Sequence, residues 1–140
     1  MSDKVTTVWK EKMIFESDNP SGYSFNLGQT ESSEDPHKPL RPKAAMLSSL
    51  AACSGLDVVS IAEKMKAEFT DLKIETEAEL TDEHPKIYNK VKVDYHFYGN
   101  SLDEKKITKA VNLSVEKYCG VMEMFRQFAK VDTNIYFHNV

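Results

Sequence analysis

Two central segments of the chain alternate strictly between apolar and polar residues. Leu72, Ile74, Thr76, Ala78 and Leu80 share one face of the first segment, and Lys73, Glu75, Glu77 and Glu79 share the other. In the second, Ile87, Val91, Val93, Tyr95 and Phe97 alternate with Lys90, Lys92, Asp94 and His96. A period of two predicts strands of a sheet with one wet face. The acidic face of one segment and the lysines of the other predict an antiparallel hairpin, with its turn at 81–85.

Helical patterns flank this hairpin. Pro42 suits a first helical position, and we expect a helix over 42–67 whose first half is apolar on nearly every side, as in a buried helix. A second helix follows Gly99, with Ser101 or Asp103 as its N-cap. Its apolar stripe ends at Cys119-Gly120, and a further short helix should present Val121, Met124, Phe125 and Phe128.

The two ends of the chain read as strands. We expect strands over 5–15 and 23–27, joined by a turn at 19–22, and a last strand over 133–140. The predicted order is β-β-α-β-β-α-α-β, a single α+β domain covering residues 1–140. A helix that is apolar on all sides must pack against other elements on all sides, and one sheet covers only one side of the helix. We therefore predict an intertwined homodimer, with the central helices packed between the sheets of both protomers.

Composition excludes several classes of function. The net charge is −4 and the only arginines are Arg41 and Arg126, so nucleic acid is not an expected partner. We see no targeting signal and no apolar run long enough to span a membrane, which predicts a cytoplasmic protein without a membrane partner. The four histidines show no metal-ligand spacing and there is no glycine-rich phosphate loop, so we expect no metal and no cofactor.

The candidate chemistry lies in two cysteines. Cys53 sits within a nearly uncharged run, and Cys119 sits at the interruption between two helical segments. Two cysteines are too few for a disulfide scaffold, which favours a redox pair. Most buried cysteines are nevertheless inert small hydrophobes, and sequence spacing does not decide between these readings. Asp57 lies one turn beyond Cys53, and we favour a structural hydrogen-bonding role for it over that of a site acid.

These same residues carry a resemblance to a known family. Pro42, Leu47, Leu50 and Cys53 in a helix of small residues resemble the first-cysteine helix of the OsmC/Ohr proteins. The segments 53–61 and 113–121 resemble the OsmC-like branch in particular. The resemblance implies the OsmC-like fold and a homodimer with active sites at the subunit interface. It also implies a peroxidase that reduces organic hydroperoxides in oxidative stress defence.

The resemblance also assigns roles. Cys53 would be the peroxidatic cysteine, oxidised to a sulfenic acid, and Cys119 the resolving cysteine. An external dithiol would be the reductant. Active peroxidases of this family carry an arginine in the N-terminal strand region and a glutamate near the start of the cysteine helix, and this chain has neither. Arg41 and Lys43, and also Asp57, are therefore candidates for activating the thiolate or contacting the substrate. The alternative is a dimer of the same fold that binds a small apolar ligand at its interface without peroxidase turnover.

Overall fold

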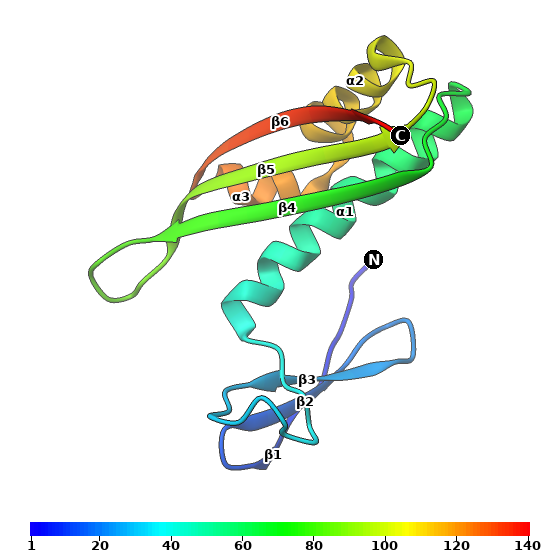
Figure 1. The fold of residues 1–140 in the computed structure, drawn as a ribbon. Helices are drawn as coiled ribbons and strands as arrows, with labels where there is room; N and C mark the ends of the chain where they lie inside the picture. The colour runs from blue at the N-terminus through cyan, green and yellow to red at the C-terminus, as the bar shows by residue number, and fades with distance from the viewer. The chain divides into compact units, whose positions relative to one another are not determined.

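The computed structural model describes all residues, 1–140, as two compact units. The first unit comprises Met1–Met46 and the second Leu47–Val140. Together they contain two three-stranded sheets and three α-helices, an α+β architecture that confirms the predicted fold class (Figure 1). That residues 1–140 act as one domain stays a prediction.

The first unit is built on an antiparallel sheet in the order β1-β2-β3. Its strands are β1 (Thr7–Glu11), β2 (Ile14–Asp18) and β3 (Ser24–Gly28). The predicted strand over 5–15 is wrong, because the chain reverses within it and forms a hairpin. Lys12 has a φ of 48°, a left-handed conformation that places the reversal between Glu11 and Ile14. The element order therefore begins with three strands rather than two.

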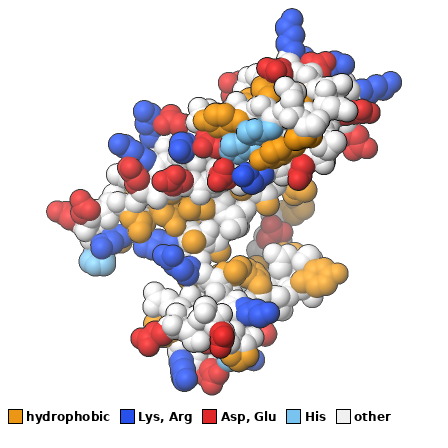
Figure 2. Space-filling view, in the orientation of Figure 1, with side chains coloured by type: hydrophobic (Ala, Val, Ile, Leu, Met, Phe, Trp, Pro, Cys, Tyr) orange, Lys and Arg blue, Asp and Glu red, His pale blue; other side chains and the backbone are white.

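The second unit contains the predicted hairpin of alternating strands. β4 (Asp71–Leu80) pairs antiparallel with β5 (Tyr88–Gly99), and β5 pairs in parallel with β6 (Lys130–Asn139). Glu77 lies opposite Lys92 and Glu79 opposite Lys90, so the predicted charge pairing is confirmed. Acidic and basic side chains are interspersed over the exposed face of this sheet (Figure 2).

The prediction for Ile87 is wrong. The alternating pattern places Ile87 on the inward face, but its side chain is 45% exposed and it precedes β5. Glu79 pairs with Lys90 and Leu80 with Tyr88, so Asn89 is an extra residue in β5. Such a bulge shifts the inward-outward alternation of side chains by one position between Tyr88 and Lys90. Tyr88 is therefore buried in place of Ile87.

The long helix α1 (Pro42–Lys64) begins at the predicted proline. Leu50, Ser54, Val58 and Ala62 follow one another at helical spacing and are buried. The helix ends three residues before the predicted boundary. Lys66 has a φ of 57°, and the amides of Lys66 and Ala67 bond to Glu63 and Ala62, which closes the C-terminus.

By length and composition α1 alone among the helices is able to cross a membrane. The core helix of a globular domain has the same length and composition. Leu50, Val58 and Ala62 of α1 are buried in the hydrophobic core together with residues of the sheet. We therefore assign α1 to the core of the second unit. The helices α1, α2 (Glu104–Leu113) and α3 (Gly120–Arg126) lie on one face of the β4-β5-β6 sheet (Figure 1).

The segment between α2 and α3 positions the second cysteine. Asp103 caps α2 by accepting a hydrogen bond from the Lys106 amide at 3.1 Å, as one of the two predicted caps. A short π-helix, η1 (Ser114–Tyr118), continues α2, and the backbone of Cys119 directly after it is extended. This wider turn interrupts the helix where the sequence predicted a break.

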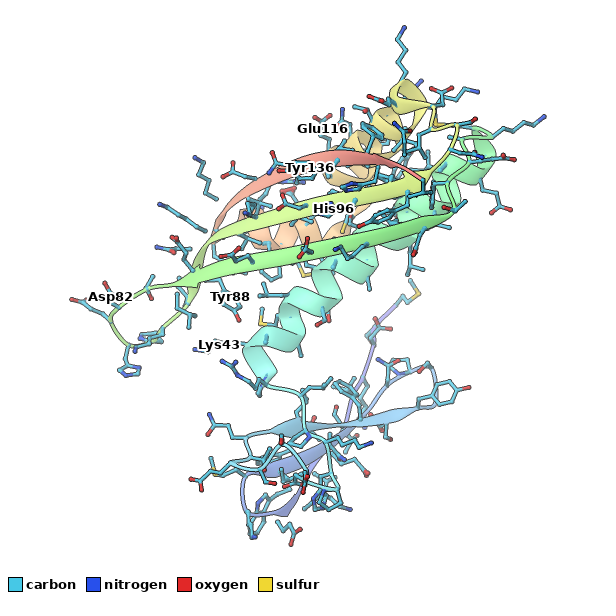
Figure 3. All side chains as sticks on the ribbon, in the orientation of Figure 1. Lys43, Asp82, Tyr88, His96, Glu116 and Tyr136 are labelled. Atoms are coloured by element: carbon cyan, nitrogen blue, oxygen red, sulfur yellow. The ribbon has the colours of Figure 1, made fainter.

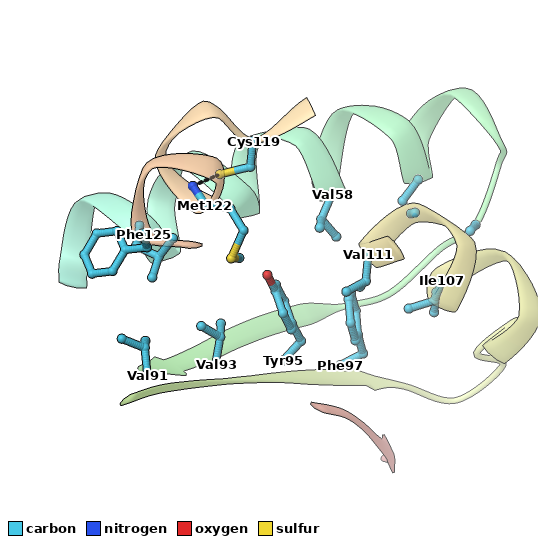
Figure 4. Packing of buried hydrophobic residues seen from close by; sticks show 14 of the residues in the cluster. Val58, Val91, Val93, Tyr95, Phe97, Ile107, Val111, Cys119, Met122 and Phe125 are labelled. Atoms are coloured by element: carbon cyan, nitrogen blue, oxygen red, sulfur yellow. Dashed lines mark hydrogen bonds between the residues drawn. The ribbon is translucent and has the colours of Figure 1, made fainter. Parts of the chain in front are cut away.

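The apolar stripe of α3 differs from the predicted one. Met122 and Phe125 are buried, whereas Met124 and Phe128 are 63% and 40% exposed. The extended backbone at Cys119 starts α3 as a new helix whose rotation does not continue that of α2. The core beneath it contains Val58, Val91, Val93, Tyr95, Phe97, Ile107, Val111, Met122 and Phe125 (Figure 4).

Candidate functional site

The structure brings the two cysteines together. Cys53 lies on α1 and is half-buried, while Cys119 lies between η1 and α3 and is only 3% exposed. Both thiols are free, and Cys53 is close enough to Cys119 to raise the pKa of the Cys119 thiol. Segments far apart in the sequence thus bring the two cysteines into one site.

The environment of Cys119 keeps its proton in place. Burial raises the pKa of the Cys119 thiol to about 11, and the hydrogen bond to Cys53 and the charges of Cys53 and Asp57 act in the same direction. The Met122 amide donates to Cys119 Sγ at 3.3 Å and opposes this rise (Figure 4).

A chain of buried hydroxyl groups lies beside the cysteines. Ser54 follows Cys53 on α1, and its Oγ lies 2.6 Å from the Oη of Tyr95 and 2.8 Å from the Oγ of Ser114. Both serines are fully buried, and Tyr95 points from β5 towards the helices (Figure 4). Burial raises the pKa of Tyr95 to about 12, although its bond to Ser54 acts against the rise. The tyrosine is therefore a neutral hydrogen-bonding group at physiological pH.

Asp57 joins this chain at its other end. The Ser114 hydroxyl lies 3.1 Å from Asp57 Oδ2 and also 3.1 Å from the backbone carbonyl of Ser54. The carboxylate is half-buried, and its charge raises the pKa of both Cys119 and Tyr95. Of the candidate activating residues, Asp57 is the one that the structure places beside the cysteine pair.

The other two candidates, Arg41 and Lys43, belong to the first unit, and both are exposed. Lys43 lies in the first turn of α1 (Figure 3). Arg41 lines an open pocket of the first unit together with Lys12 and Gln29. Their proposed contact with the thiolate stays a prediction.

Sequence reasoning missed the hydroxyl groups as part of the site. Tyr95 belongs to the predicted inward face of its strand, Ser114 lies within the second predicted helix, and Ser54 occupies a helix position flanked by Leu50 and Val58. A hydroxyl on an inward face needs a partner, so three such residues are a usable signal. In contrast, no three His, Cys, Asp or Glu residues are arranged to hold a metal ion.

Comparisons with known proteins agree with this architecture. A family model described as OsmC-like protein matches residues 35–134. Protein YhfA of Escherichia coli K12 is 26% identical over 123 residues, which cover 88% of this chain and 89% of YhfA. A hypothetical protein of Aquifex aeolicus has a crystal structure with a TM-score of 0.88 and 28% identity, covering 100% of this chain and 98% of that one.

The fold is also shared with a protein named for its phenotype. The organic hydroperoxide resistance protein OsmC of Legionella pneumophila, also described as a predicted redox protein, has a TM-score of 0.69. Its identity is 14%, and the match covers 97% of each chain, so this likeness concerns the fold alone. The resemblance inferred from the two cysteine motifs is confirmed, and the chain belongs to the family of OsmC-like proteins.

Proposed function

We propose that this protein is a thiol-dependent peroxidase that reduces organic hydroperoxides. The nearness of Cys53 to Cys119 carries the proposal, because it provides an attacking and a resolving sulfur in one site. Membership of the OsmC-like family, and the name of the Legionella relative, support this chemistry. We place the reaction in the cytoplasm, where free thiols persist.

Cys53 is the peroxidatic residue in this proposal. It is half-buried, whereas Cys119 is buried and keeps its proton, so Cys53 is the sulfur that a substrate reaches first. Its thiolate attacks the terminal peroxide oxygen and the O–O bond breaks. The substrate leaves as an alcohol after taking up a proton, and Cys53 becomes a sulfenic acid.

Cys119 completes the oxidative half of the cycle. Its sulfur attacks the Cys53 sulfur, an S–S bond forms, and the oxygen leaves as water. An external dithiol then reduces the disulfide by two exchange steps and is itself oxidised to a disulfide. No cofactor enters this sequence, because the dithiol supplies both electrons.

In this proposal the protein acts as a homodimer. Leu56 and Val59 lie on the side of α1 away from its buried stripe and are 73% and 48% exposed. A second copy of the chain covers these residues in our proposal. The partner subunit is also the proposed source of the cation that activates Cys53, with Arg41 and Lys43 as the candidates.

A turnover assay tests the function. Reduced protein is supplied with a dithiol and either cumene hydroperoxide or hydrogen peroxide, and peroxide consumption is followed. We expect faster turnover with cumene hydroperoxide, and loss of turnover in Cys53→Ser and Cys119→Ser. Consumption that persists in Cys53→Ser would overturn the assignment. Tight binding of apolar molecules without any turnover would instead support a ligand-binding dimer.

A further inference from the structure

The hydroxyl chain beside the cysteines has a direction. An ionised carboxylate only accepts hydrogen bonds, so the Ser114 hydroxyl donates to Asp57 Oδ2, sharing its hydrogen with the Ser54 carbonyl. Ser54 then donates to Ser114, and Tyr95 donates to Ser54. Three hydroxyl groups in series therefore point towards Asp57. Each bond polarises the next, and together they hold the carboxylate in a fixed orientation.

Ser114 also holds the backbone of Cys119 in place. The Cys119 amide donates to the Ser114 carbonyl at 2.8 Å, while the Ser114 side chain bonds to Asp57. Ser114 thus ties the resolving cysteine and the carboxylate to one point in the core. The titratable groups that interact electrostatically with the Cys119 thiol are Cys53 and Asp57 from α1 and Tyr95 from β5.

Only one of these groups is suited to accept a proton during disulfide formation. Cys53 is the sulfur under attack, and Tyr95 is a neutral phenol whose hydroxyl already donates to Ser54. A general base acts within hydrogen-bond reach of the proton or through one water. The Asp57 carboxylate is only half-buried, so it can pass a proton on to solvent.

We propose that Asp57 is the general base of the resolving step, held in place by Ser114. As the Cys119 sulfur attacks the Cys53 sulfenic acid, the thiol proton passes to Asp57 and the S–S bond forms. The S–O bond breaks at the same time, and the departing hydroxide takes the proton from Asp57 to become water. The inference deepens the proposed function, because it rests on the roles of the two cysteines.

A purely electrostatic role of Asp57 predicts the opposite effect of its removal. The Asp57 charge raises the pKa of the Cys119 thiol, so an uncharged residue would increase the thiolate fraction and accelerate attack by Cys119. Loss of a base slows the attack instead, typically by about 100-fold or more. The sign of the change in rate therefore separates the two roles.

The experiment uses disulfide exchange without any peroxide. Reduced protein reacts with DTNB, which leaves a thionitrobenzoate group on Cys53, and Cys119 then expels this group by forming the protein disulfide. The absorbance of the second thionitrobenzoate released reports the attack by Cys119 alone. The Cys119→Ser variant should release only one equivalent. Because no peroxide is present, this result is independent of whether the protein is a peroxidase.

We expect Asp57→Asn to slow the second release by roughly 100-fold at neutral pH. Its remaining rate should depend more steeply on pH than that of the wild type, because without the carboxylate only the Cys119 thiolate, whose pKa is raised, can attack. Asp57→Glu, which retains a carboxylate, should recover part of the rate. Ser114→Ala should slow the release to a smaller extent, and Asp94→Asn on the outer sheet face should not change it.

An Asp57→Asn protein that releases the second group as fast as the wild type, or faster, would overturn the proposal. If that variant does not fold, the pH profiles of Asp57→Glu and Ser114→Ala decide the question. Profiles identical to that of the wild type in both variants would also contradict a base at Asp57.

Discussion

Cys53 of α1 lies near enough to Cys119 to raise the pKa of the Cys119 thiol. Cys119 reaches this position because the π-helix η1 ends at Tyr118 and the backbone becomes extended at Cys119. The Met122 amide then fixes its sulfur from the first turn of α3. The two sulfurs nonetheless differ in accessibility, since Cys53 is half-buried and Cys119 is buried.

This difference predicts unequal alkylation of the two thiols. Iodoacetamide at neutral pH should modify Cys53 at least about tenfold faster than Cys119, because burial excludes the reagent and the raised pKa of Cys119 depletes its thiolate. Mass spectrometry of native protein after timed alkylation measures both rates. In urea the two rates should become equal, which is the control. Equal rates in the native state would contradict the described burial.

The buried ionisable groups predict a loss of stability at alkaline pH. The folded-state pKa values of Cys119 and Tyr95, about 11 and about 12, exceed their ordinary values of 9.0 and 10.0. Above pH 9 the unfolded chain releases protons that the folded chain retains, so the free energy of unfolding falls as pH rises to about 11.

Denaturation of reduced protein at pH 8 and pH 10.5 measures this fall. Cys119 should contribute up to about 2 kcal/mol to it, and Cys119→Ala should make the dependence on pH shallower. An unchanged slope in Cys119→Ala would show that this thiol is not the group responsible.

The hydroxyl chain predicts graded effects of substitution on stability. Tyr95→Phe removes the hydroxyl group at one end of the hydrogen-bonded series and should lower the free energy of unfolding by about 1 kcal/mol. Ser54→Ala leaves both Tyr95 and Ser114 without their shared partner and should cost about 2 kcal/mol or more. Ser60→Ala, at an exposed position of the same helix, is the matched control. Urea denaturation that ranks Tyr95→Phe above Ser54→Ala in cost would argue against this network.

The exposed side of α1 predicts the site of self-association. Leu56→Lys places a charge on the face that we propose is buried in the dimer, and it should weaken dimerisation at least about 100-fold. Sedimentation equilibrium of the wild type and the variant measures the dissociation constant. Asn100→Lys adds the same charge at the end of β5 and should leave association unchanged. A wild type that stays monomeric at high concentration would reject the dimer.

Patterns with strong local causes were predicted correctly from the sequence. β4 and β5 alternate because one face of their sheet is wet, and Pro42 and Asp103 mark helix starts through their own backbone chemistry. The reversal at Lys12 was missed because lysine carries no turn signal, and a left-handed conformation there depends on its surroundings.

The site was less predictable for a different reason. The contact between Cys53 and Cys119 depends on how η1 packs against α1, which no local pattern specifies. Ser54 and Ser114 looked like small core residues, because their hydroxyl partners come from other elements of the fold. The family resemblance supplied the pairing of the cysteines, but not the carboxylate and hydroxyl chain beside them.

Rapid mixing of reduced protein with one equivalent of cumene hydroperoxide tests the proposed function most directly. Samples are quenched with an alkylating agent at timed intervals, and mass spectrometry identifies the oxidised sulfur. Our account predicts oxidation of Cys53 much faster than that of a free thiol, followed by a disulfide with Cys119, and a persistent Cys53 sulfenic acid in Cys119→Ser. Oxidation of Cys53 at the rate of a free thiol would contradict the assignment of peroxidase activity.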